Sequence, residues 1–516
     1  MTASTSADAG AQDRVFAFLT DPATHPGVHR IDTHAAAVFL EGARALKIKR
    51  AVRFPYLDYS TLAKRKAACD EEIEVNRPFA PQIYHRVVPI TQNADGSLSI
   101  DGSGPPVEFA IEMTRFDERQ TIDHLAEAGE PDRDLVDAIA DVIAASHAVA
   151  PLAPGEPWIG SIPTFIDDNS TAFRTAACFP ASDVDDLDDA SRSAFSRIRK
   201  LLEQRCRQGY VRRCHGDLHL ANIALIEHKP VLFDAIEFDP TIASVDVVYD
   251  LAFPIMDLLH YGRNAAANAL LNRYLKTASL EHVDALAALP LFLSLRAAIR
   301  AKVLLARLGR TSRHDADVMQ SAREYFELAC RLIRPATPTL VAIGGLSGTG
   351  KSVLAHALAP DVMPLPGAVL LRSDVLRKQH FQLKETDRLP ASAYQPRITG
   401  QIYDVLLQRA LHVLVQGHSV VVDAVFARET ERAALQKAAR RQNIRFVGFF
   451  LETDLATRQS RVRRREVDAS DATPEIAELQ EQYDLGAVDW DIIDASGTPE
   501  QTLEQCQARI TQCEAT

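Results

Sequence analysis

A glycine-rich stretch in the C-terminal part of the sequence has the residue types and spacing needed to hold phosphate groups. Residues 345–352 read GLSGTGKS and fit the pattern G-x-x-x-x-G-K-[ST]. Such a loop wraps phosphate oxygens with backbone N–H groups, and glycines are required because a Cβ would obstruct that approach. A strand is predicted before the loop, in LVAIGG, and a helix after it, in KSVLAHALA, whose N-terminal end favours the same anion. Lys351 is expected to reach the outer phosphates and the Ser352 hydroxyl to ligate Mg²⁺. The predicted nucleotide-binding residues are Gly345, Ser347, Gly348, Thr349, Gly350, Lys351 and Ser352.

Two acidic residues end the strands that are predicted after this loop. Asp374 follows the strand in LLRSDVLRK and Asp423 ends VVVD, and ligands bind at the carboxyl ends of the strands in parallel sheets. There Asp374 could accept a proton from an acceptor hydroxyl, with Arg377 one helical turn on to hold the substrate. The alternative is that Ser373 or Asp374 caps the helix that follows. Asp423 is the candidate second acid, expected to hold Mg²⁺ or water.

An arginine-rich helix is predicted within TRQSRVRRREVDASDA. Arg458, Arg461 and Arg465 recur there at helical spacing, which suits a lid that closes over transferring phosphates. A solvated basic helix face would show the same pattern. On the lid interpretation, Arg461 and Arg465 contact the nucleotide.

A second set of polar residues lies earlier in the chain. Residues 215–234 read HGDLHLANIALIEHKPVLFD, in which an Asp is followed five residues later by an Asn and then by an Asp after a hydrophobic strand. Kinases hold a phosphoryl group with residues in this arrangement. The sequence therefore carries two separate sets of residues suited to phosphoryl transfer.

The elements around the second set are predicted to be strands first and helices afterwards. AAAVFL and RALKIKRAVRF, joined by a turn at Glu41-Gly42, indicate a hairpin. A helix in STLAKRKAACDEEIEVNR should end before Pro78, and short strands should follow in YHRVVPI and VEFAIEMTRF. From about Asp132 to about Leu332 the pattern is mostly helical. This order indicates a bilobal plan.

The last third of the chain has a different organisation. RPATPT, at residues 334–339, has the composition of a linker, and strands and helices alternate after it. Such alternation predicts a parallel sheet with crossover helices. We therefore predict a mobile segment over 1–27, an α+β bilobal domain over 28–333, the linker, and an α/β doubly wound domain over 340–516.

Composition narrows the classes of partner. The chain has 516 residues, too many for one core, with 47% hydrophobic and 24% charged residues. A formal net charge of −12 disfavours a dedicated nucleic-acid binder, whose surface would be basic. Seven cysteines without CxxC spacing, no apolar run of membrane length and no secretory signal lead us to expect a cytoplasmic protein whose partner is a small molecule.

The stretch HGDLHLAN resembles the catalytic loop of the aminoglycoside phosphotransferase and choline kinase branch of the protein-kinase-like fold. The resemblance implies that Asp217 accepts the proton of the acceptor hydroxyl. It implies that Asn222 and Asp234 bind Mg²⁺ beside the phosphates of ATP.

Other residues of this half follow from the same resemblance. His215 and Asp250, the latter in SVDVVYDLA, are expected to brace the catalytic loop, and Glu237 either assists the metal or caps a turn. His219 has no assigned role and is expected at the surface. The segment THAAAVFLEGARA has one glycine where protein kinases have a glycine-rich loop, which is a departure from the kinase pattern.

The resemblance also requires a lysine on the third strand and an acidic partner on the next helix. Lys47 and Lys49 lie two residues apart and therefore share one strand face, so the pattern alone does not separate them. Lys47 matches the kinase motif better and is preferred. Glu72 is preferred as its partner over Glu71 and Glu74.

An acceptor site is expected in the helical lobe. The helix predicted in PLFLSLRAAIRAKVLLARL is mostly apolar, yet Arg296 and Arg300 fall on one face of it. Cations on a buried helix could hold an anionic group of the substrate, or they could pair with buried acids.

GGLSGTGKS, RSDVLRK, VVVDAVFARETER and the arginine-rich helix resemble the small-molecule P-loop kinases, over about Thr339 to the C-terminus. The whole chain resembles bacterial two-domain proteins that join an aminoglycoside-phosphotransferase-like half to a P-loop kinase half. The resemblance implies ATP-dependent transfer to hydroxyl groups of small metabolites, with Mg²⁺. Two alternatives are a nucleotide or ligand sensor in one half, most readily the N-terminal one, and a polynucleotide 5′-hydroxyl kinase.

Overall fold

The computed structural model describes residues 6–54, 57–277, 280–308, 315–464 and 469–514. The chain folds into two compact units. The first consists of Met1–Phe165 and Arg199–Tyr261, and the second of Ile166–Ile198 and Gly262–Thr516. No helix among the described residues is long and apolar enough to cross a membrane.

The first unit contains a six-stranded sheet in the order β1-β2-β3-β8-β6-β7. The predicted hairpin is confirmed, because β2 and β3 pair antiparallel with Glu41 opposite Arg44. The predicted helix α2 (Leu62–Asn76) ends before Pro78, as expected. One side of the sheet is buried against α2, with Cys69 of the helix and Ile111 of β8 in one hydrophobic cluster. The strands are β1 (His29–Asp32), β2 (Ala36–Glu41), β3 (Arg44–Lys49), β6 (Tyr84–Gln92), β7 (Leu98–Ile100) and β8 (Pro106–Thr114).

Residues 6–19 of the N-terminal segment form a helix that packs on the sheet. Helix α1 (Ser6–Leu19) buries Val15, Phe16 and Leu19 in the same hydrophobic cluster as the sheet residues Phe39 and Ile48. These apolar residues form one helix face that covers the sheet. The prediction of a mobile segment over 1–27 is therefore wrong for the residues of α1.

A buried glutamine on α1 adds polar contacts to this packing. The side chain of Gln12 donates to Lys49 O at 2.8 Å and to Glu108 Oε2 at 2.9 Å, and it accepts from Ala51 N at 2.9 Å. Glu108 in turn pairs with the buried Arg65 at 2.9 Å. Every partner in this network is buried. The network therefore connects α1 to the end of β3, the strand that carries Lys47 and Lys49.

The rest of the first unit supplies the polar stretch at residues 215–234. The stretch follows β9 (Val211–Arg213), contains the hairpin of β10 (Ile223–Ile226) and β11 (Lys229–Leu232), and ends two residues after it. Helix α8 (Val247–His260) is buried along almost its whole length. The other helices of this part are α3 (Ile122–Ala128), α4 (Arg133–Val149) and α7 (Pro240–Ala243), while α5 (Glu156–Ala176) and α6 (Ala181–Arg207) begin or end in it.

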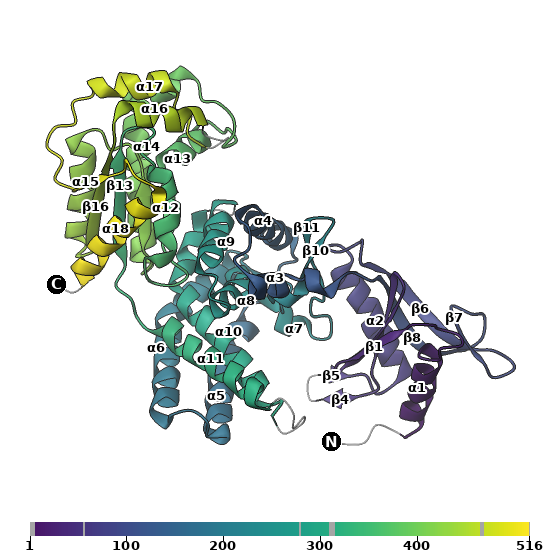
Figure 1. Ribbon diagram of the computed structural model, residues 1–516. Helices are drawn as coiled ribbons and strands as arrows, with labels where there is room; N and C mark the ends of the chain where they lie inside the picture. Colours follow the sequence, from purple (N-terminus) through teal and green to yellow (C-terminus); the bar gives the residue numbers. More distant parts are fainter. Residues whose placement is uncertain (1–5, 55–56, 278–279, 309–314, 465–468, 515–516) are drawn as a thin grey trace. The chain divides into compact units, whose positions relative to one another are not determined.

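The second unit contains a five-stranded parallel sheet in the order β14-β15-β13-β16-β17. Strands β13 and β16 of this sheet are labelled in Figure 1. Val341 and Ile343 on one face pack against Leu354 of α12, whereas Leu340 and Ala342 on the other face are also buried, so helices cover both faces. The predicted doubly wound arrangement is confirmed. The strands are β13 (Thr339–Gly345), β14 (Val369–Arg372), β15 (Val420–Asp423), β16 (Arg445–Glu452) and β17 (Asp491–Asp494). The helices are α12 (Lys351–Leu358), α13 (Ser373–His380), α14 (Pro396–Val415), α15 (Glu429–Arg441), α16 (Leu455–Arg464), α17 (Pro474–Leu479) and α18 (Pro499–Glu514).

Helices that precede the predicted linker belong to the same compact unit as this sheet. They include α9 (Asn264–Thr277), α10 (Leu289–Leu305) and α11 (Asp315–Ile333). The Asn272 side chain on α9 accepts from Leu370 N at 2.7 Å and donates to Ala368 O at 3.1 Å, so it occupies the open edge of β14. Asn268 donates to the same carbonyl at 3.0 Å. The compact units therefore do not coincide with the division at residues 334–339.

Candidate active sites

The glycine-rich loop joins β13 to α12 and is packed closely by two neighbouring segments. Gly345 has a φ of +133°, and a Cβ there would lie 2.6 Å from Leu451 O. Gly348 has a φ of +89°, and a Cβ there would lie 2.6 Å from Arg458 O of α16. Glycine is therefore required at both positions by backbone conformation and by space.

Gly348→Ala should destabilise the loop by about 1–3 kcal/mol and weaken nucleotide binding, because the alanine meets backbone atoms at an unfavourable φ. Thermal unfolding and titration with a fluorescent ATP analogue would measure both effects. Gly400→Ala is the matched control, since Gly400 lies in α14 with nothing within 4 Å of the added Cβ. Nucleotide affinity equal to that of the wild type in Gly348→Ala would contradict the prediction.

The side chains of the last two residues of this loop contact the end of β15 and the loop itself. Ser352 Oγ donates to Asp423 Oδ2 at 2.6 Å, and Lys351 Nζ donates to Leu346 O at 3.0 Å. A hydroxyl and a carboxylate are hard oxygen ligands of the kind that Mg²⁺ prefers. Ser352 and Asp423 therefore fit the metal-holding role predicted for them.

Arg372 also lies at this point, although sequence reasoning did not include it. Its guanidinium donates to Asp423 Oδ2 at 3.2 Å and to Ser352 Oγ at 3.1 Å. The register places Arg372 of β14 directly opposite Asp423 of β15. Its position at a strand end, two residues before Asp374, is the sequence signal that could have identified it.

The predicted acceptor residues Asp374 and Arg377 lie on α13. Burial and the neighbouring Asp423 raise the pKa of Asp374 above its ordinary value, against the opposing effect of Arg372 and Lys351. A raised pKa is suited to a carboxylate that accepts a proton near neutral pH.

Arg377 is held in place by the protein itself. The Arg377 side chain is buried and donates to Ala393 O at 2.5 Å and to Thr399 Oγ1 at 3.3 Å. Its guanidinium also lies 5.0 Å from the ring centroid of Tyr394. Its predicted contact with substrate stays a prediction.

The arginines predicted to form a lid have different surroundings. Arg458 is buried, pairs with Glu481 and lies 3.4 Å from Ser347 O. Arg461 donates to Gly497 O at 2.9 Å and to Thr349 O at 3.4 Å. Arg465 lies outside the described residues. Two of the three arginines therefore contact the phosphate-binding loop through its backbone.

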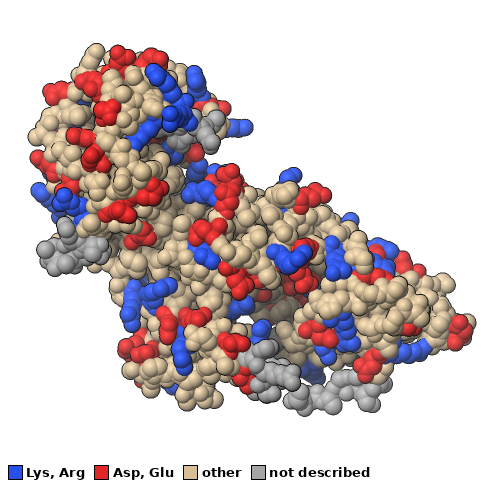
Figure 2. All heavy atoms as spheres, viewed as in Figure 1, with Lys and Arg blue, Asp and Glu red and all other residues tan. Residues whose placement is uncertain are grey.

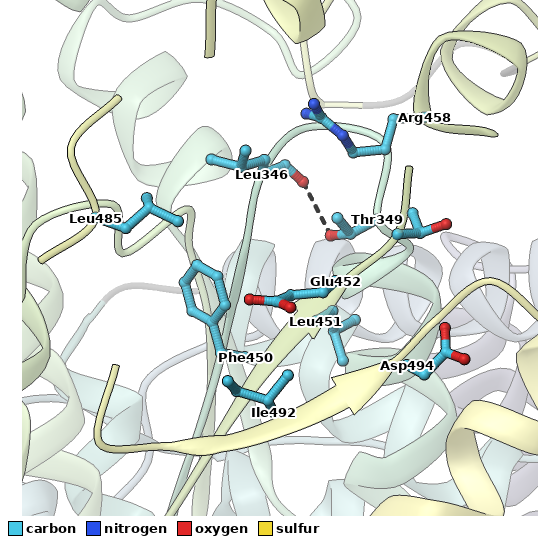
Figure 3. Close-up of a pocket in the computed structure, with 10 residues that line it drawn as sticks. Leu346, Thr349, Phe450, Leu451, Glu452, Arg458, Leu485, Ile492 and Asp494 are labelled. Carbon is cyan, nitrogen blue, oxygen red and sulfur yellow. Dashed lines mark hydrogen bonds between the residues drawn. The ribbon is translucent and has the colours of Figure 1, made fainter. Parts of the chain in front are cut away.

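A pocket of about 400 Å³ opens beside this loop (Figure 3). Leu346, Phe450 and Ile492 supply apolar walls, and Glu452 and Asp494, the paired last residues of β16 and β17, supply carboxylates. The lining contains none of the residues predicted to hold metal or acceptor.

In the first unit, Lys47 of β3 contacts both Glu72 of α2 and Asp234, which follows β11. Lys47 Nζ lies 2.8 Å from Glu72 Oε1 and 2.5 Å from Asp234 Oδ1. Burial alone would lower the pKa of Lys47, but Asp234 and Glu72 raise it well above its ordinary value. The lysine is therefore charged and links the two acids.

Lys49, the alternative to Lys47, takes part in the same cluster. Its ammonium pairs with Glu72 and with Glu237, and Tyr59 donates to Glu237 at 2.9 Å. The Lys49 side chain is 3% exposed, against 14% for Lys47 and 45% for Asp234, so the Lys47–Asp234 pair is the one open to a ligand. Sequence reasoning missed Tyr59 and the pairing of both lysines with one glutamate.

Glu72→Gln should lower the free energy of unfolding of this unit by about 3–5 kcal/mol, because it leaves two buried ammonium groups short of a counter-charge. Nucleotide binding should weaken as well. Glu74→Gln on the same helix is the control, since Glu74 is exposed, and should change stability by less than about 0.5 kcal/mol. Urea unfolding of both variants provides the measurement, and equal effects would contradict the assignment of Glu72.

The catalytic loop predicted from HGDLHLAN is held by short contacts. Asn222 Nδ2 donates to Asp217 O at 2.8 Å and lies 3.5 Å from Asp217 Oδ2. The His215 ring lies 2.9 Å from Phe233 O, and Asp250 Oδ1 accepts from Gly216 N at 2.8 Å. His215 and Asp250 therefore make the bracing contacts expected of them.

His219 is not at the surface. Its side chain is 9% exposed, and its two ring nitrogens face Asp217 and Asp257. The expectation of a surface residue is wrong because the loop turns into a short 3₁₀ turn that carries His219 against α8.

Arg296 and Arg300 lie on α10 and are both half-buried. Lys302 on the same helix lies 3.8 Å from Asp168, and burial lowers its pKa. The role of the two arginines in acceptor binding stays a prediction.

Comparison with known proteins bears on both sets of residues. Residues 30–289, half of the chain, match the family model described as the phosphotransferase enzyme family. The chain belongs to this phosphotransferase family. Residues 340–484 match a second model, described as an AAA domain. The predicted two-part arrangement, its fold classes and its assignment to the kinase and phosphotransferase enzymes are confirmed.

One relative of this phosphotransferase covers most of the chain, and the similar solved structures cover smaller shares of it. An uncharacterized protein of Mycobacterium tuberculosis is 29% identical over 494 residues, which cover 92% of this chain and 93% of that protein. Among solved structures, a choline/ethanolamine kinase family protein from Mesorhizobium loti is similar with 14% identity and a TM-score of 0.36, covering 63% of this chain and 99% of that one. A gluconokinase from Sinorhizobium meliloti is similar with 18% identity and a TM-score of 0.26, covering 34% of this chain and 94% of that one.

Proposed function

We propose that the chain carries two kinase-type active sites, each of which transfers the γ-phosphoryl group of ATP to a hydroxyl group of a small metabolite. The acceptors belong to the class of sugars, amino-alcohols or nucleoside-like molecules. The observation that carries the proposal is the cluster in which Lys47 joins Glu72 to Asp234. A sensor that only binds nucleotide would not need a base, a metal-binding amide and a metal-binding acid in one loop region.

In the first unit the acceptor oxygen would form a bond to the γ-phosphorus while the bond to the β,γ-bridging oxygen breaks, leaving ADP. Asp217 takes the proton of the hydroxyl, and Lys47 holds phosphate oxygens. Asn222 and Asp234 are the residues that would hold Mg²⁺, which when bound neutralises charge on the phosphates.

In the second unit Asp374 takes the corresponding role of proton acceptor. Backbone N–H groups of residues 345–350 and the Lys351 ammonium bind the phosphates, and Ser352 and Asp423 would hold Mg²⁺. Arg377 and Tyr394 lie beside the base and are suited to orient an acceptor.

Small acceptors are favoured over polynucleotides by charge. The chain carries a formal net charge of −12, and acidic and basic side chains are interspersed over the face shown in Figure 2. A polynucleotide site would require a continuous basic surface.

A screen of a metabolite library for ATP-dependent phosphorylation would test the proposal. It should use the full chain, the Asp217→Asn variant, the Lys351→Ala variant and the double variant. Each single variant should lose one product and keep the other, and the double variant should lose both. Full activity of Asp217→Asn on every acceptor would instead favour a sensor role for the N-terminal half, and a 5′-phosphorylated oligonucleotide product would favour the polynucleotide alternative.

A further inference from the structure

The buried His219 lies between two carboxylates of the first unit. Its Nε2 lies 2.9 Å from Asp217 Oδ1, and its Nδ1 lies 3.4 Å from Asp257 Oδ2. The ring also makes an edge contact with Phe253, with 5.1 Å between centroids. The imidazole is therefore held on three sides, and one side is the predicted catalytic base.

Asp257 is itself fixed by the loop that it supports. Its Oδ2 accepts from Leu220 N at 3.0 Å, and its side chain is 6% exposed. Asp250, seven residues earlier on α8, accepts from Gly216 N at 2.8 Å. Residues seven apart share one helix face. One face of α8 thus holds the catalytic loop on both sides of Asp217.

Burial of the polar His219 ring has a desolvation cost that an apolar side chain of similar size would avoid. Burial alone would lower the pKa of His219, but Asp257 and Asp217 raise it above its ordinary value. A phenylalanine or leucine would fill the same space without the desolvation of a polar ring. The ring therefore contributes more than packing.

We propose that His219, oriented by Asp257, is a positioning residue that fixes the rotation of the Asp217 carboxylate. Its contact with Oδ1 directs the other oxygen, Oδ2, to the side of Asn222, where the phosphates and the acceptor hydroxyl are expected. Rotation of the carboxylate would break the contact with His219. The inference rests on the proposed role of Asp217 as base.

Steady-state kinetics of the full chain carrying Lys351→Ala, which silences the second site, would test the inference. ATP turnover would be measured with water or an acceptor found in the screen. His219→Leu should lower kcat by about 10²-fold, since a small misplacement of a catalytic group has an effect of this size. The KM for ATP should change little, because His219 contacts neither Lys47 nor Asp234.

Two conservative variants separate positioning from packing. The side-chain amide of His219→Gln reaches the place of Nε2 and should retain most of kcat, whereas that of His219→Asn reaches only the place of Nδ1 and should not. This comparison also decides the matter if His219→Leu fails to fold. Equal kcat values for the two amides would overturn the inference.

A double-mutant cycle with Asp217→Asn completes the test. Without the base there is no carboxylate to orient, so adding His219→Gln or His219→Asn to Asp217→Asn should cause no further loss. Additive losses would overturn the inference and indicate a structural role. If Asp217→Asn is inactive while His219→Asn and His219→Leu keep full kcat, the inference fails and the proposed function stands. If Asp217→Asn is fully active, the proposed function itself fails.

Discussion

Asp217→Asn, placed in the full chain together with Lys351→Ala, should lower phosphoryl transfer by about two to four orders of magnitude. The substitution keeps the shape of the side chain and removes the group that accepts the proton of the acceptor. Nucleotide binding should survive, because Lys47 and Asp234 are untouched and lie 2.5 Å apart in their own pair. Rapid-quench measurement of transfer and equilibrium titration with a fluorescent ATP analogue would separate the two effects.

Two further variants serve as comparisons for this result. Asp234→Asn should weaken Mg²⁺-dependent nucleotide binding along with turnover, because it removes a proposed metal ligand and a partner of Lys47. Asp189→Asn, an exposed position on α6, should leave both properties unchanged. Unchanged transfer by Asp217→Asn would mean that residues 215–222 form a structural loop.

Lys351→Ala, combined with Asp217→Asn, should lower turnover at the second site by at least about 10²-fold while leaving the fold intact. The Lys351 ammonium is a point charge for the outer phosphates, and one of its contacts in the protein is a loop carbonyl, Leu346 O, at 3.0 Å. Substituting Lys351 therefore removes a positive charge that would bind the phosphates, and it leaves no cavity in a hydrophobic core.

Circular dichroism and the midpoint of thermal unfolding would check the fold of Lys351→Ala, and ATP turnover would check the site. Lys437→Ala, at an exposed position on α15, is the control for loss of a lysine. A normal turnover rate in Lys351→Ala would remove the phosphate-binding role from residues 345–352.

The sequence was most informative where backbone geometry dictates residue type. The glycines of residues 345–352 were recognised from spacing because no other residue tolerates the φ of Gly348 beside the backbone of Arg458. Asp423 at the end of β15 and Asp374 two residues after the end of β14 were recognised because a parallel sheet gathers its carboxyl ends at one edge.

Other residues were missed because their roles depend on contacts between distant segments. His219 was expected at the surface, since no local pattern connects it to Asp257, which lies 38 residues later on a helix. Lys49 and Lys47 share a strand face, so the sequence pattern does not separate them. The structure shows that both pair with the buried Glu72. The helix at residues 6–19 was missed because its large apolar residues follow a polar start.

The side-chain amide of Asn272 covers the open edge of β14, and this contact affects how the two coding regions of the gene can recombine. Residues 30–289, which match the phosphotransferase family, include Asn272, whereas β14 lies within residues 340–484, which match the AAA domain. A strand edge left bare can pair with other chains, and natural proteins avoid such edges. A gene fragment that encoded only the second part would therefore need a new protecting residue for β14, so recombination should tend to transmit the two coding regions as one piece.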